Sequence, residues 1–336
     1  MTQAADATLS NGEGRSPPPA GGGVPGHCGP MFTIFIPTYN RAYCLPRAFQ
    51  SIAESTCQDL EVVVIDDGST DDTPALVAEW QRRAPFPLRY YFQENAGKAN
   101  AHNRAVTEAE GYFFLNLDSD DSLIPGALRA VLAEWAAVPE GHREALSGIA
   151  GLLLEEDGSV SGTPYPLERV DSDYLEIHSL GYVHGDKREA TRTSVLREFP
   201  YPSIAGERHV RDNLIFRRMA HRYKTRFVNL PLVVGRREAD GITANIRRYR
   251  EQNPQGMRLA FLEEVTLHDA YADSAQLHRN HVRYVRFSLH SGVGLVRQAR
   301  EVKHRRKWLA ALPEGFGSWL ADRARLLLHR GDRPQG

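Results

Sequence analysis

From residue 32 onward the chain alternates short apolar runs with helical segments, and this alternation limits the fold more than any other feature. The predicted strands are residues 32–36, 60–65, 88–93 and 112–117, and the predicted helices are 45–55, 72–84, 98–109 and 125–138. Strands separated by helices of about ten residues are typical of right-handed βαβ units. Residues 60–65 are almost wholly apolar, which indicates a strand buried on both faces. The pattern predicts an α/β fold with a doubly wound, mostly parallel sheet and flanking helices.

The polar segments after three of these strands fall on one rim of that sheet. They are Pro37–Arg41, Asp66–Thr70 and Asp118–Asp121. In open α/β sheets, ligands bind beyond the carboxyl ends of the strands, so these segments predict a binding site. No Gly-x-Gly-x-x-Gly follows the first strand, and no Walker-type lysine loop is present. Those absences argue against a standard dinucleotide or ATP-phosphate cradle.

The run at 118–121 places three carboxylates within four positions: Asp118, Asp120 and Asp121. Two ionised carboxylates about 5 Å apart repel by roughly 3 kcal/mol at an effective dielectric of about 20. A divalent cation offsets such repulsion, and Mg²⁺ binds through one or two carboxylates plus substrate phosphates. The alternative is an acidic turn that caps the next helix before Pro125. The neighbouring polar loops on the same rim favour the metal site.

The size and charge of the chain limit the number of domains and the kinds of partner that it can have. With 336 residues it can hold one large α/β domain plus an extension. The net charge of −1 implies no partner, and no apolar run approaches the ~18 residues of a membrane span. The three cysteines have no metal-ligand spacing, and the histidines form no zinc-type cluster. This cysteine usage favours a reducing, cytoplasmic location.

Three regions differ in composition. Residues 1–30 are rich in Gly, Pro, Ala and Ser and are predicted to be disordered; since Met31 directly precedes the first strand, whether they belong to the natural product stays open. Residues 31–246 form the predicted α/β domain. Residues 247–336 form a helical extension that is basic, with 12 Lys and Arg against 3 acids between residues 277 and 330.

The order and spacing of these motifs resemble a family 2 glycosyltransferase of GT-A-type fold, from a branch that builds bacterial polysaccharides. The resemblance is specific over residues 33–128 and weaker over 185–245. The residues that carry it are Ile34-Phe35-Ile36-Pro37-Thr38-Tyr39-Asn40-Arg41, Val63-Val64-Ile65-Asp66-Asp67-Gly68-Ser69-Thr70-Asp71, Asn95-Ala96-Gly97-Lys98 with Asn103, and Leu117-Asp118-Ser119-Asp120-Asp121. It implies a nucleotide-binding half at 31–140 and an acceptor half at 141–246.

The resemblance also implies roles for individual residues. Asp118 and Asp120 match the family's Asp-x-Asp motif, which meets the ribose and a Mn²⁺ or Mg²⁺ ion on the diphosphate; Asp121 is a supporting acid. Tyr39 would pack on the base, and Asp67 would accept a hydrogen bond from the base edge. The residues expected around the donor are Pro37, Thr38, Tyr39, Arg41, Asp67, Lys98, Asp118 and Ser119.

A general base is expected where the family shows a Glu-Asp pair at the head of a helix. The best register gives Arg211-Asp212, in which Asp212 keeps the acid and Arg211 replaces the glutamate. Glu207 is the rival candidate. Either acid could instead simply stabilise the start of a helix through the macrodipole. A base needs only to be ionised and within ~3 Å of the acceptor hydroxyl.

Three further segments carry weaker expectations. Asp186 and Lys187 either line the sugar or acceptor pocket or form an exposed ion pair. Residues 236–243 resemble a loop that folds over the site, with Gly241 as a hinge. Residues 277–300 and 319–329 are expected to be basic amphipathic helices. These either bind an anionic lipid surface or pack on the catalytic domain, and they carry too few aromatics for nucleic-acid stacking.

These observations predict an inverting, metal-dependent transferase. It would move a sugar from a nucleotide donor, with a UDP-sugar favoured, to a hydroxyl of a glycan or lipid-linked glycan, in the cytoplasm or at the inner face of the membrane. Inversion is implied by the resemblance alone. One alternative is the same fold transferring to polyprenyl phosphate, which needs no general base. Another is a catalytically silent nucleotide-binding subunit of a polysaccharide assembly complex.

Overall fold

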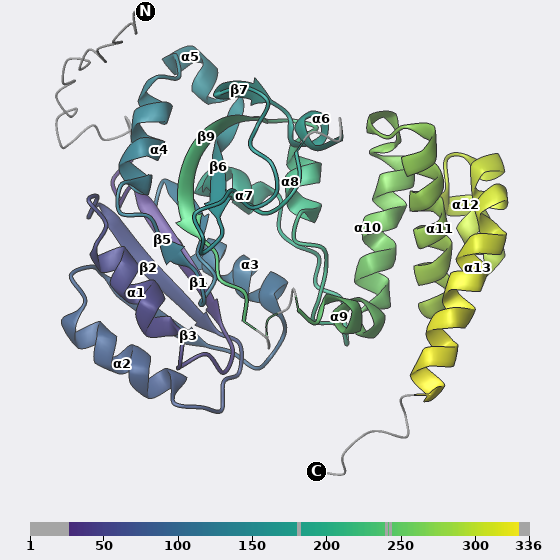
Figure 1. The fold of residues 1–336 in the computed structure, drawn as a ribbon, viewed down its shortest axis with the longest axis horizontal. Helices are drawn as coiled ribbons and strands as arrows, with labels where there is room; N and C mark the ends of the chain where they lie inside the picture. The colour runs from purple at the N-terminus through teal and green to yellow at the C-terminus, as the bar shows by residue number, and fades with distance from the viewer. Residues whose placement is uncertain (1–26, 180–182, 239–240, 242–243, 329–336) are drawn as a thin grey trace, which may run out of the picture.

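A nine-stranded sheet forms the centre of the computed structural model, which describes residues 27–179, 183–238, 241 and 244–328 (Figure 1). One half of the sheet is wholly parallel, in the order β3-β2-β1-β4. Its strands are β1 (Phe32–Thr38), β2 (Leu60–Asp66), β3 (Leu88–Phe92) and β4 (Phe113–Asn116). The helices that connect and follow them are α1 (Leu45–Ala53), α2 (Thr73–Arg83), α3 (Lys98–Glu108) and α4 (Ala127–Ala136).

The two faces of the sheet are covered by different helices. Side chains of α1, α2 and α4 pack on one face, with Phe49, Trp80 and Val131 among the buried residues. Ala101 and Ala105 of α3 pack on the other face. Every residue of β2 is buried, as its apolar sequence predicts. The doubly wound α/β fold is therefore confirmed.

The other half of the sheet is mixed, and its strands were not predicted. In it β8 lies antiparallel to β4 and to β6, while β9 runs parallel to β6 and antiparallel to β5 and β7. The strand β8 reads Lys-Arg-Glu-Ala-Thr-Arg, so its charged residues conceal a strand from pattern reading. The strands are β5 (Ser122–Leu123), β6 (Leu146–Leu154), β7 (Arg169–Ser172), β8 (Lys187–Arg192) and β9 (Lys224–Val234).

Short helices border this half, and longer ones form the carboxy-terminal extension. The short ones are α5 (Glu140–Arg143), α6 (Tyr174–Ser179), α7 (Thr193–Glu198) and α8 (Leu214–Met219). The extension comprises α9 (Ile246–Gln252), α10 (Pro254–Thr266), the 3-10 turn Asp269–Tyr271, α11 (Ser274–His290), α12 (Leu295–Glu301) and α13 (Arg305–Leu328). The helix expected over 277–300 is wrong in its bounds, because a turn at 291–294 with Gly292 at φ +70° divides it.

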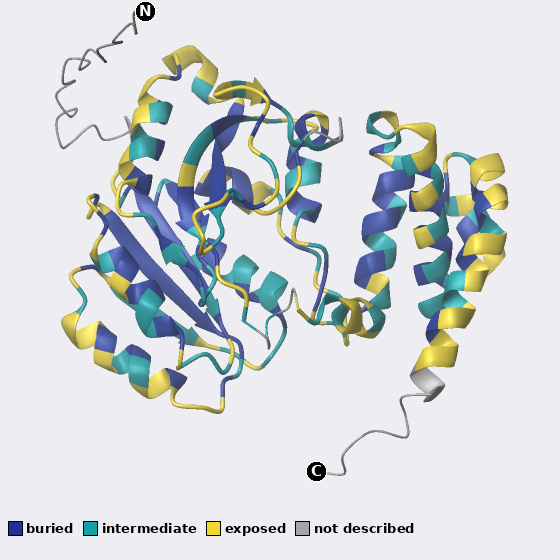
Figure 2. Cartoon of the chain, in the orientation of Figure 1, coloured by how far each residue is buried: buried dark blue, intermediate teal, exposed yellow. Residues whose placement is uncertain are grey.

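Helix α10 joins the extension to the α/β part. Figure 2 shows buried residues along its length. Ala260 packs with Val210 and Leu214 of the α/β part. Phe261 and neighbouring side chains of α10 pack in a separate core with α11 and α13. Within the described ranges, no helix has the length and apolarity to cross a bilayer. The predicted disorder of residues 1–30 falls almost wholly outside the described residues, which begin at His27.

Candidate functional site

The loops after β1 and β2 are tied together at the sheet rim. The amide of Asp67 donates to the carbonyl of Thr38 over 2.8 Å. The amide of Asn40 donates to Ser69 Oγ over 2.8 Å, and Asn40 Oδ1 accepts from the Thr70 amide over 2.7 Å. Asn40 holds the left-handed conformation that this crossing requires, with φ at +53°, which asparagine tolerates better than most residues. The two predicted loops therefore form one surface.

Asp67 is buried and holds the segment that precedes α3. Its Oδ1 accepts from Gln93 Nε2 and from the Ala96 amide, each over 2.8 Å, and its Oδ2 accepts from the Gly97 amide over 2.8 Å. A carboxylate offers about four acceptor positions, so roughly one remains for a ligand. The structure thus gives Asp67 a loop-organising role that the sequence did not predict.

Gly97 fixes where α3 begins. Its φ is +89°, and a Cβ at this position would lie 1.8 Å from the carbonyl oxygen of Arg208. Only glycine fits, because both the backbone conformation and the contact with the 208 segment exclude a side chain. Helix α3 starts at the next residue, Lys98, whose ammonium points at the acidic run.

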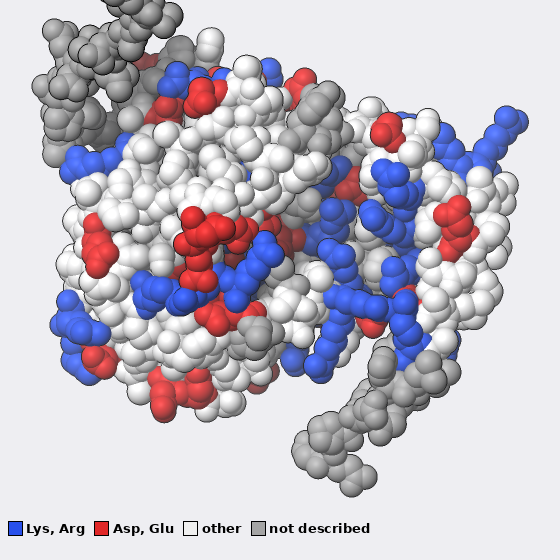
Figure 3. All heavy atoms as spheres, viewed as in Figure 1, with Lys and Arg blue, Asp and Glu red and all other residues white. Residues whose placement is uncertain are grey.

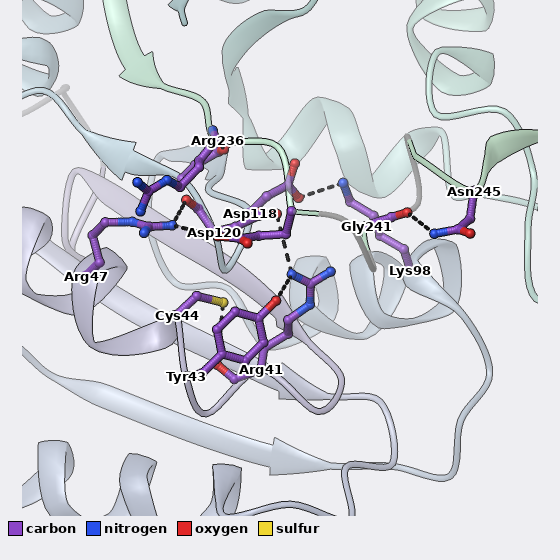
Figure 4. Close-up of polar contacts among 12 residues, drawn as sticks. Arg41, Tyr43, Cys44, Arg47, Lys98, Asp118, Asp120, Arg236, Gly241 and Asn245 are labelled. Atoms are coloured by element: carbon purple, nitrogen blue, oxygen red, sulfur yellow. Dashed lines mark hydrogen bonds and ion pairs between the residues drawn. The ribbon is translucent and has the colours of Figure 1, made fainter. Parts of the chain in front are cut away.

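Asp118 lies between two cations (Figure 4 shows Lys98). Lys98 Nζ is 2.6 Å from its Oδ1, Arg188 Nη2 is 3.1 Å from its Oδ2, and Asn116 Nδ2 donates to Oδ1 over 3.1 Å. Burial alone would raise the pKa of Asp118, but the charges of Lys98 and Arg188 outweigh it and hold that pKa well below its usual range. Asp118 is therefore ionised at neutral pH.

Asp120 and Asp121 have different surroundings. Arg41 Nη1 lies 3.6 Å from Asp120 Oδ2, and burial, followed by the charge of Asp118, raises the pKa of Asp120. Asp121 is buried, 2.5 Å from Arg188 Nη2, and accepts from the Arg236 amide over 3.1 Å. Burial raises the pKa of Asp121 to about 6. Asp121 thus has a structural role, because it holds the side chain of Arg188 and the backbone amide of Arg236.

The donor set suits a hard divalent cation that takes its remaining ligands from a substrate. Asp120 has too little positive charge around it to offset its burial and the charge of Asp118, so a cation there would favour its ionised form. Among the described residues, no group of three or more His, Cys, Asp or Glu side chains could hold a metal by itself. Mg²⁺-type sites commonly use one or two carboxylates plus phosphates and water, which matches this arrangement.

The other residues expected at the donor site divide by exposure. Tyr39 is 48 % exposed at the rim, where its ring is open to a ligand. Thr38 and Ser119 are buried at the strand ends, and Pro37 is half-buried. Arg41 Nη1 donates a hydrogen bond to the hydroxyl of Tyr43 over 2.8 Å. The structure therefore brings Tyr39, Arg41, Lys98 and the acidic run to one rim.

The two candidate bases differ sharply. The carboxylate of Glu207 accepts from the amides of Gln255 and Gly256, each over 2.7 Å, and so caps the start of α10. Asp212 is exposed at the head of α8, and its charge, after that of Asp118, raises the pKa of Lys98 against the effect of burial. Its backbone carbonyl accepts from the hydroxyl of Tyr201. The oxygens of Glu207 are therefore occupied by backbone amides, whereas the side chain of Asp212 is exposed and its charge acts on Lys98.

Arg188 is a site residue that sequence reasoning missed. It bridges Asp118 and Asp121 from β8, which no apolar pattern revealed. A signal existed in the neighbouring Lys187, which was expected to line a pocket or form an exposed ion pair. The exposed ion pair is wrong for Lys187, because it is buried and donates to the carbonyls of Ser161 and His184 over 3.0 and 2.7 Å; that it lines a pocket stays a prediction.

The loop expected to fold over the site is described only in part. The amide of Arg236 contacts Asp121, and Arg47 Nη2 lies 3.7 Å from Glu238. The carbonyl of Gly241 accepts from Asn245 Nδ2 over 3.0 Å (Figure 4). Residues 239–240 and 242–243 lie outside the described residues.

Comparison with known proteins gives a consistent result. Residues 33–141 match the model of the Glycosyl transferase family 2. A chondroitin synthase of Escherichia coli is 40 % identical over 106 residues, which are 32 % of this chain and 15 % of that protein, so the chain spans a small part of this relative.

Two solved structures show a similar fold. The structure of S. aureus TarS 1-349 in complex with UDP-GlcNAc has a TM-score of 0.55 at 20 % identity, covering 86 % of this chain and 81 % of that one. The mannosyltransferase PcManGT from Pyrobaculum calidifontis in complex with GDP-Man and Mn²⁺ has a TM-score of 0.50 at 20 % identity, covering 88 % of each chain. These likenesses confirm the predicted GT-A-type fold.

Proposed function

We propose that this chain, which belongs to the family 2 glycosyltransferases, moves a sugar from a nucleotide donor to a hydroxyl of a glycan or glycolipid, with inversion at the sugar carbon. A UDP-sugar is the favoured donor, since the fold is shared with a protein solved in complex with UDP-GlcNAc. One observation carries the proposal. Lys98 Nζ lies 2.6 Å from Asp118 Oδ1, which places a fixed positive charge beside the acidic run where the donor diphosphate would bind.

Cleavage of a nucleotide sugar develops negative charge on the leaving diphosphate. Lys98 and Arg41 stand beside the acidic run and supply fixed positive charge for it. Tyr39 offers an exposed ring for the base, and Asp67 retains about one acceptor position for a ring N–H. Asp118 and Asp120 would hold Mn²⁺ or Mg²⁺, which when bound contributes Lewis-acid stabilisation of the diphosphate.

Asp212 is the proposed general base. It is exposed, and a carboxylate there can take the proton of an acceptor hydroxyl as that oxygen attacks the sugar. The charge of Asp212, after that of Asp118, also raises the pKa of Lys98 against the effect of burial. Glu207 is the weaker candidate, because both of its oxygens already cap α10.

The test is a panel of nucleotide sugars, assayed for donor hydrolysis and for transfer with Mn²⁺. We expect one donor to be consumed, and consumption to fall by about 10²-fold or more in Asp120→Asn. Asp212→Asn should lose about 10²- to 10⁴-fold in transfer while it still binds the donor, and Glu207→Gln should not.

The same measurements separate the alternatives. Full transfer by Asp212→Asn would favour a polyprenyl phosphate acceptor, whose phosphate needs no base. UDP binding without consumption of any donor would favour a silent nucleotide-binding subunit, and absence of metal-dependent UDP binding by the wild-type chain in calorimetry would overturn the enzyme proposal. A cytoplasmic location with peripheral attachment through the basic extension belongs to the same proposal, and cosedimentation with anionic vesicles tests it.

A further inference from the structure

Basic side chains gather in the groove between the α/β part and the carboxy-terminal helices (Figure 3). We call them the arginine groove. Its members are Arg211, Arg250, Arg279, Arg283 and Arg286. The charge of Asp212 acts on Arg250, just as it acts on Lys98. Arg211, a member of the groove, directly precedes Asp212 in the chain, so Asp212 lies beside this groove.

The side chains of the arginine groove converge on common features. The guanidinium carbons of Arg211 and Arg283 lie 5.3 and 5.5 Å from the centre of the same Phe261 ring. Arg279, Arg283 and Arg286 recur at steps of four and three residues, which places them on one face of α11. They line a hollow of about 180 Å³ with Val282, Glu314 and Ser318. The hollow thus lies between α11 and α13, while Arg250 belongs to α9 and Arg211 precedes α8.

Part of this positive charge has no acidic partner. Arg211 lies 3.1 Å from Glu264, and Arg286 lies 2.5 Å from Asp322. Across the described ranges, none of Arg250, Arg279 and Arg283 has a carboxylate within ion-pair distance, and Arg279 donates only to the side-chain oxygen of Gln276. The pKa of Arg283 is lowered by burial and then by the charges of Arg211, Arg250 and Arg279. The repulsion among these arginines does not stabilise the folded chain.

Such a cluster is suited to an anionic ligand. The planar guanidinium fork matches phosphate and carboxylate oxygens bidentately, and several arginines together favour a multiply charged group. A diphosphate carries enough charge to offset most of three unpaired arginines, whereas one carboxylate does not. The donor diphosphate is assigned to Lys98 and the acidic run, so a second phosphate group must come from the acceptor.

We propose that the arginine groove binds the phosphate or diphosphate group of a phosphate-bearing acceptor, and that this holds the acceptor hydroxyl at Asp212. The proposal rests on the proposed function, because it assumes that Asp212 faces the acceptor. The phosphate could belong to a lipid-linked sugar diphosphate or to a soluble sugar phosphate, since the arginines would recognise the same group in both.

The experiment is a calorimetric titration of the full chain in EDTA with two probes, geranyl diphosphate and glucose 1-phosphate. The variant R250Q/R283Q removes two of the three arginines that have no acidic partner, so no carboxylate is left unpaired. The control R306Q/K307Q removes the same charge from exposed positions at the start of α13. We expect saturable binding that weakens by at least tenfold in R250Q/R283Q and stays within twofold in the control. A thermal melt verifies that both variants fold.

The outcomes distinguish the sources and the alternatives. Binding of geranyl diphosphate alone supports a lipid-linked diphosphate, and binding of both probes supports a sugar phosphate. Equal or tighter binding of glucuronate would overturn the phosphate assignment. The phosphate assignment would also be overturned if binding were seen only with vesicles of phosphatidylglycerol and phosphatidylcholine and were lost equally in the control R306Q/K307Q. Parallel titrations use UDP with Mn²⁺: uptake of geranyl diphosphate without UDP overturns the proposed function alone, and uptake of UDP without any phosphate probe overturns this site alone.

Discussion

The ammonium of Lys98 lies 2.6 Å from a carboxylate oxygen of Asp118, and this contact links the first turn of α3 to the end of β4. Asp118 is also held by Arg188, so it remains ionised without a metal. Such a site is suited to a charged ligand, because a substrate group could replace one partner of the ion pair between Lys98 and Asp118.

Replacing Lys98 by Met should lower the transfer rate by about 10²-fold or more, because the fixed charge beside the leaving diphosphate is lost. The pKa of Asp118 should rise towards its usual range, since one of its two cations has gone. Steady-state kinetics with the donor found in the panel measures the effect. Lys224→Met, at an exposed position, is the matched control. Unchanged kinetics in Lys98→Met would contradict this role.

Replacing Asp120 by Asn should abolish the response to metal. We expect wild-type activity to disappear in EDTA and return with Mn²⁺, and the Asn variant to need at least tenfold more Mn²⁺ or to stay inactive. The reason is that a cation offsets the charge of Asp118 and Asp120 together. A Mn²⁺ titration at fixed donor concentration measures this. Asp157→Asn, in an exposed turn, should respond like the wild type.

Replacing Glu207 by Gln should weaken the docking of α10. The carboxylate accepts from two amides at the start of this helix, so losing the charge should cost about 1 kcal/mol in the free energy of unfolding. Urea denaturation measures the loss, with the exposed Glu140→Gln as the control. A variant that keeps full stability but loses transfer would instead identify Glu207 as the base.

His102 should make the protein sensitive to acid. Its ring packs against Phe114 and Tyr201, with centroids 5.1 and 5.0 Å apart, and burial lowers its pKa to about 3. Between that value and the unfolded value of about 6.5, the unfolded chain binds one proton more than the folded chain. The stability that neutral His102 contributes is therefore complete above pH 6.5 and is lost as the pH falls towards 3.

The measurement is the free energy of unfolding in urea between pH 7.5 and 4.5. The wild type should lose up to about 1.4 kcal/mol per pH unit below 6.5 from this residue, and His102→Leu should show a slope that is shallower by that amount. The exposed His142→Gln should keep the wild-type slope. Identical slopes in all three proteins would show that His102 does not titrate as described.

Replacing Gly97 by Ala should destabilise the fold by about 1–3 kcal/mol, because it combines a positive φ with a clash against the Arg208 carbonyl. The shift should move Lys98 as well, so transfer should fall more than stability alone explains. Gly126→Ala, at a position with open space around it, is the control. Equal melting temperatures and rates for the two variants would contradict this account.

The parallel half of the sheet was predictable because its strands are apolar runs and its helices begin at Pro, Asp or Gly signals. β2 shows this well, with seven buried residues in sequence. The rim site followed from the same reasoning, since the carboxyl ends of parallel strands share an edge. Tyr39 and Asp118 could therefore be placed together from the sequence, whereas Lys98 was expected there only because of the family resemblance.

The mixed half was not predictable, and neither were the partners that it contributes. Arg188 lies in a strand that looks like a charged surface segment, and only its pairing with β4 brings it to Asp118. The capping role of Glu207 depends on α10, which lies 47 residues further along the chain. Such contacts arise from tertiary packing, which local sequence patterns do not encode.

The docking of α10 also bears on how this protein could be divided or recombined. A fragment ending at residue 246 would expose Val210 and Leu214, which Ala260 covers. It would also leave Arg217 and Arg218 without the glutamates of α10 that they contact at 2.6 Å. A chimera designed to exchange acceptor preference should therefore carry its junction beyond Thr266, so that the receiving domain keeps its own covering helix.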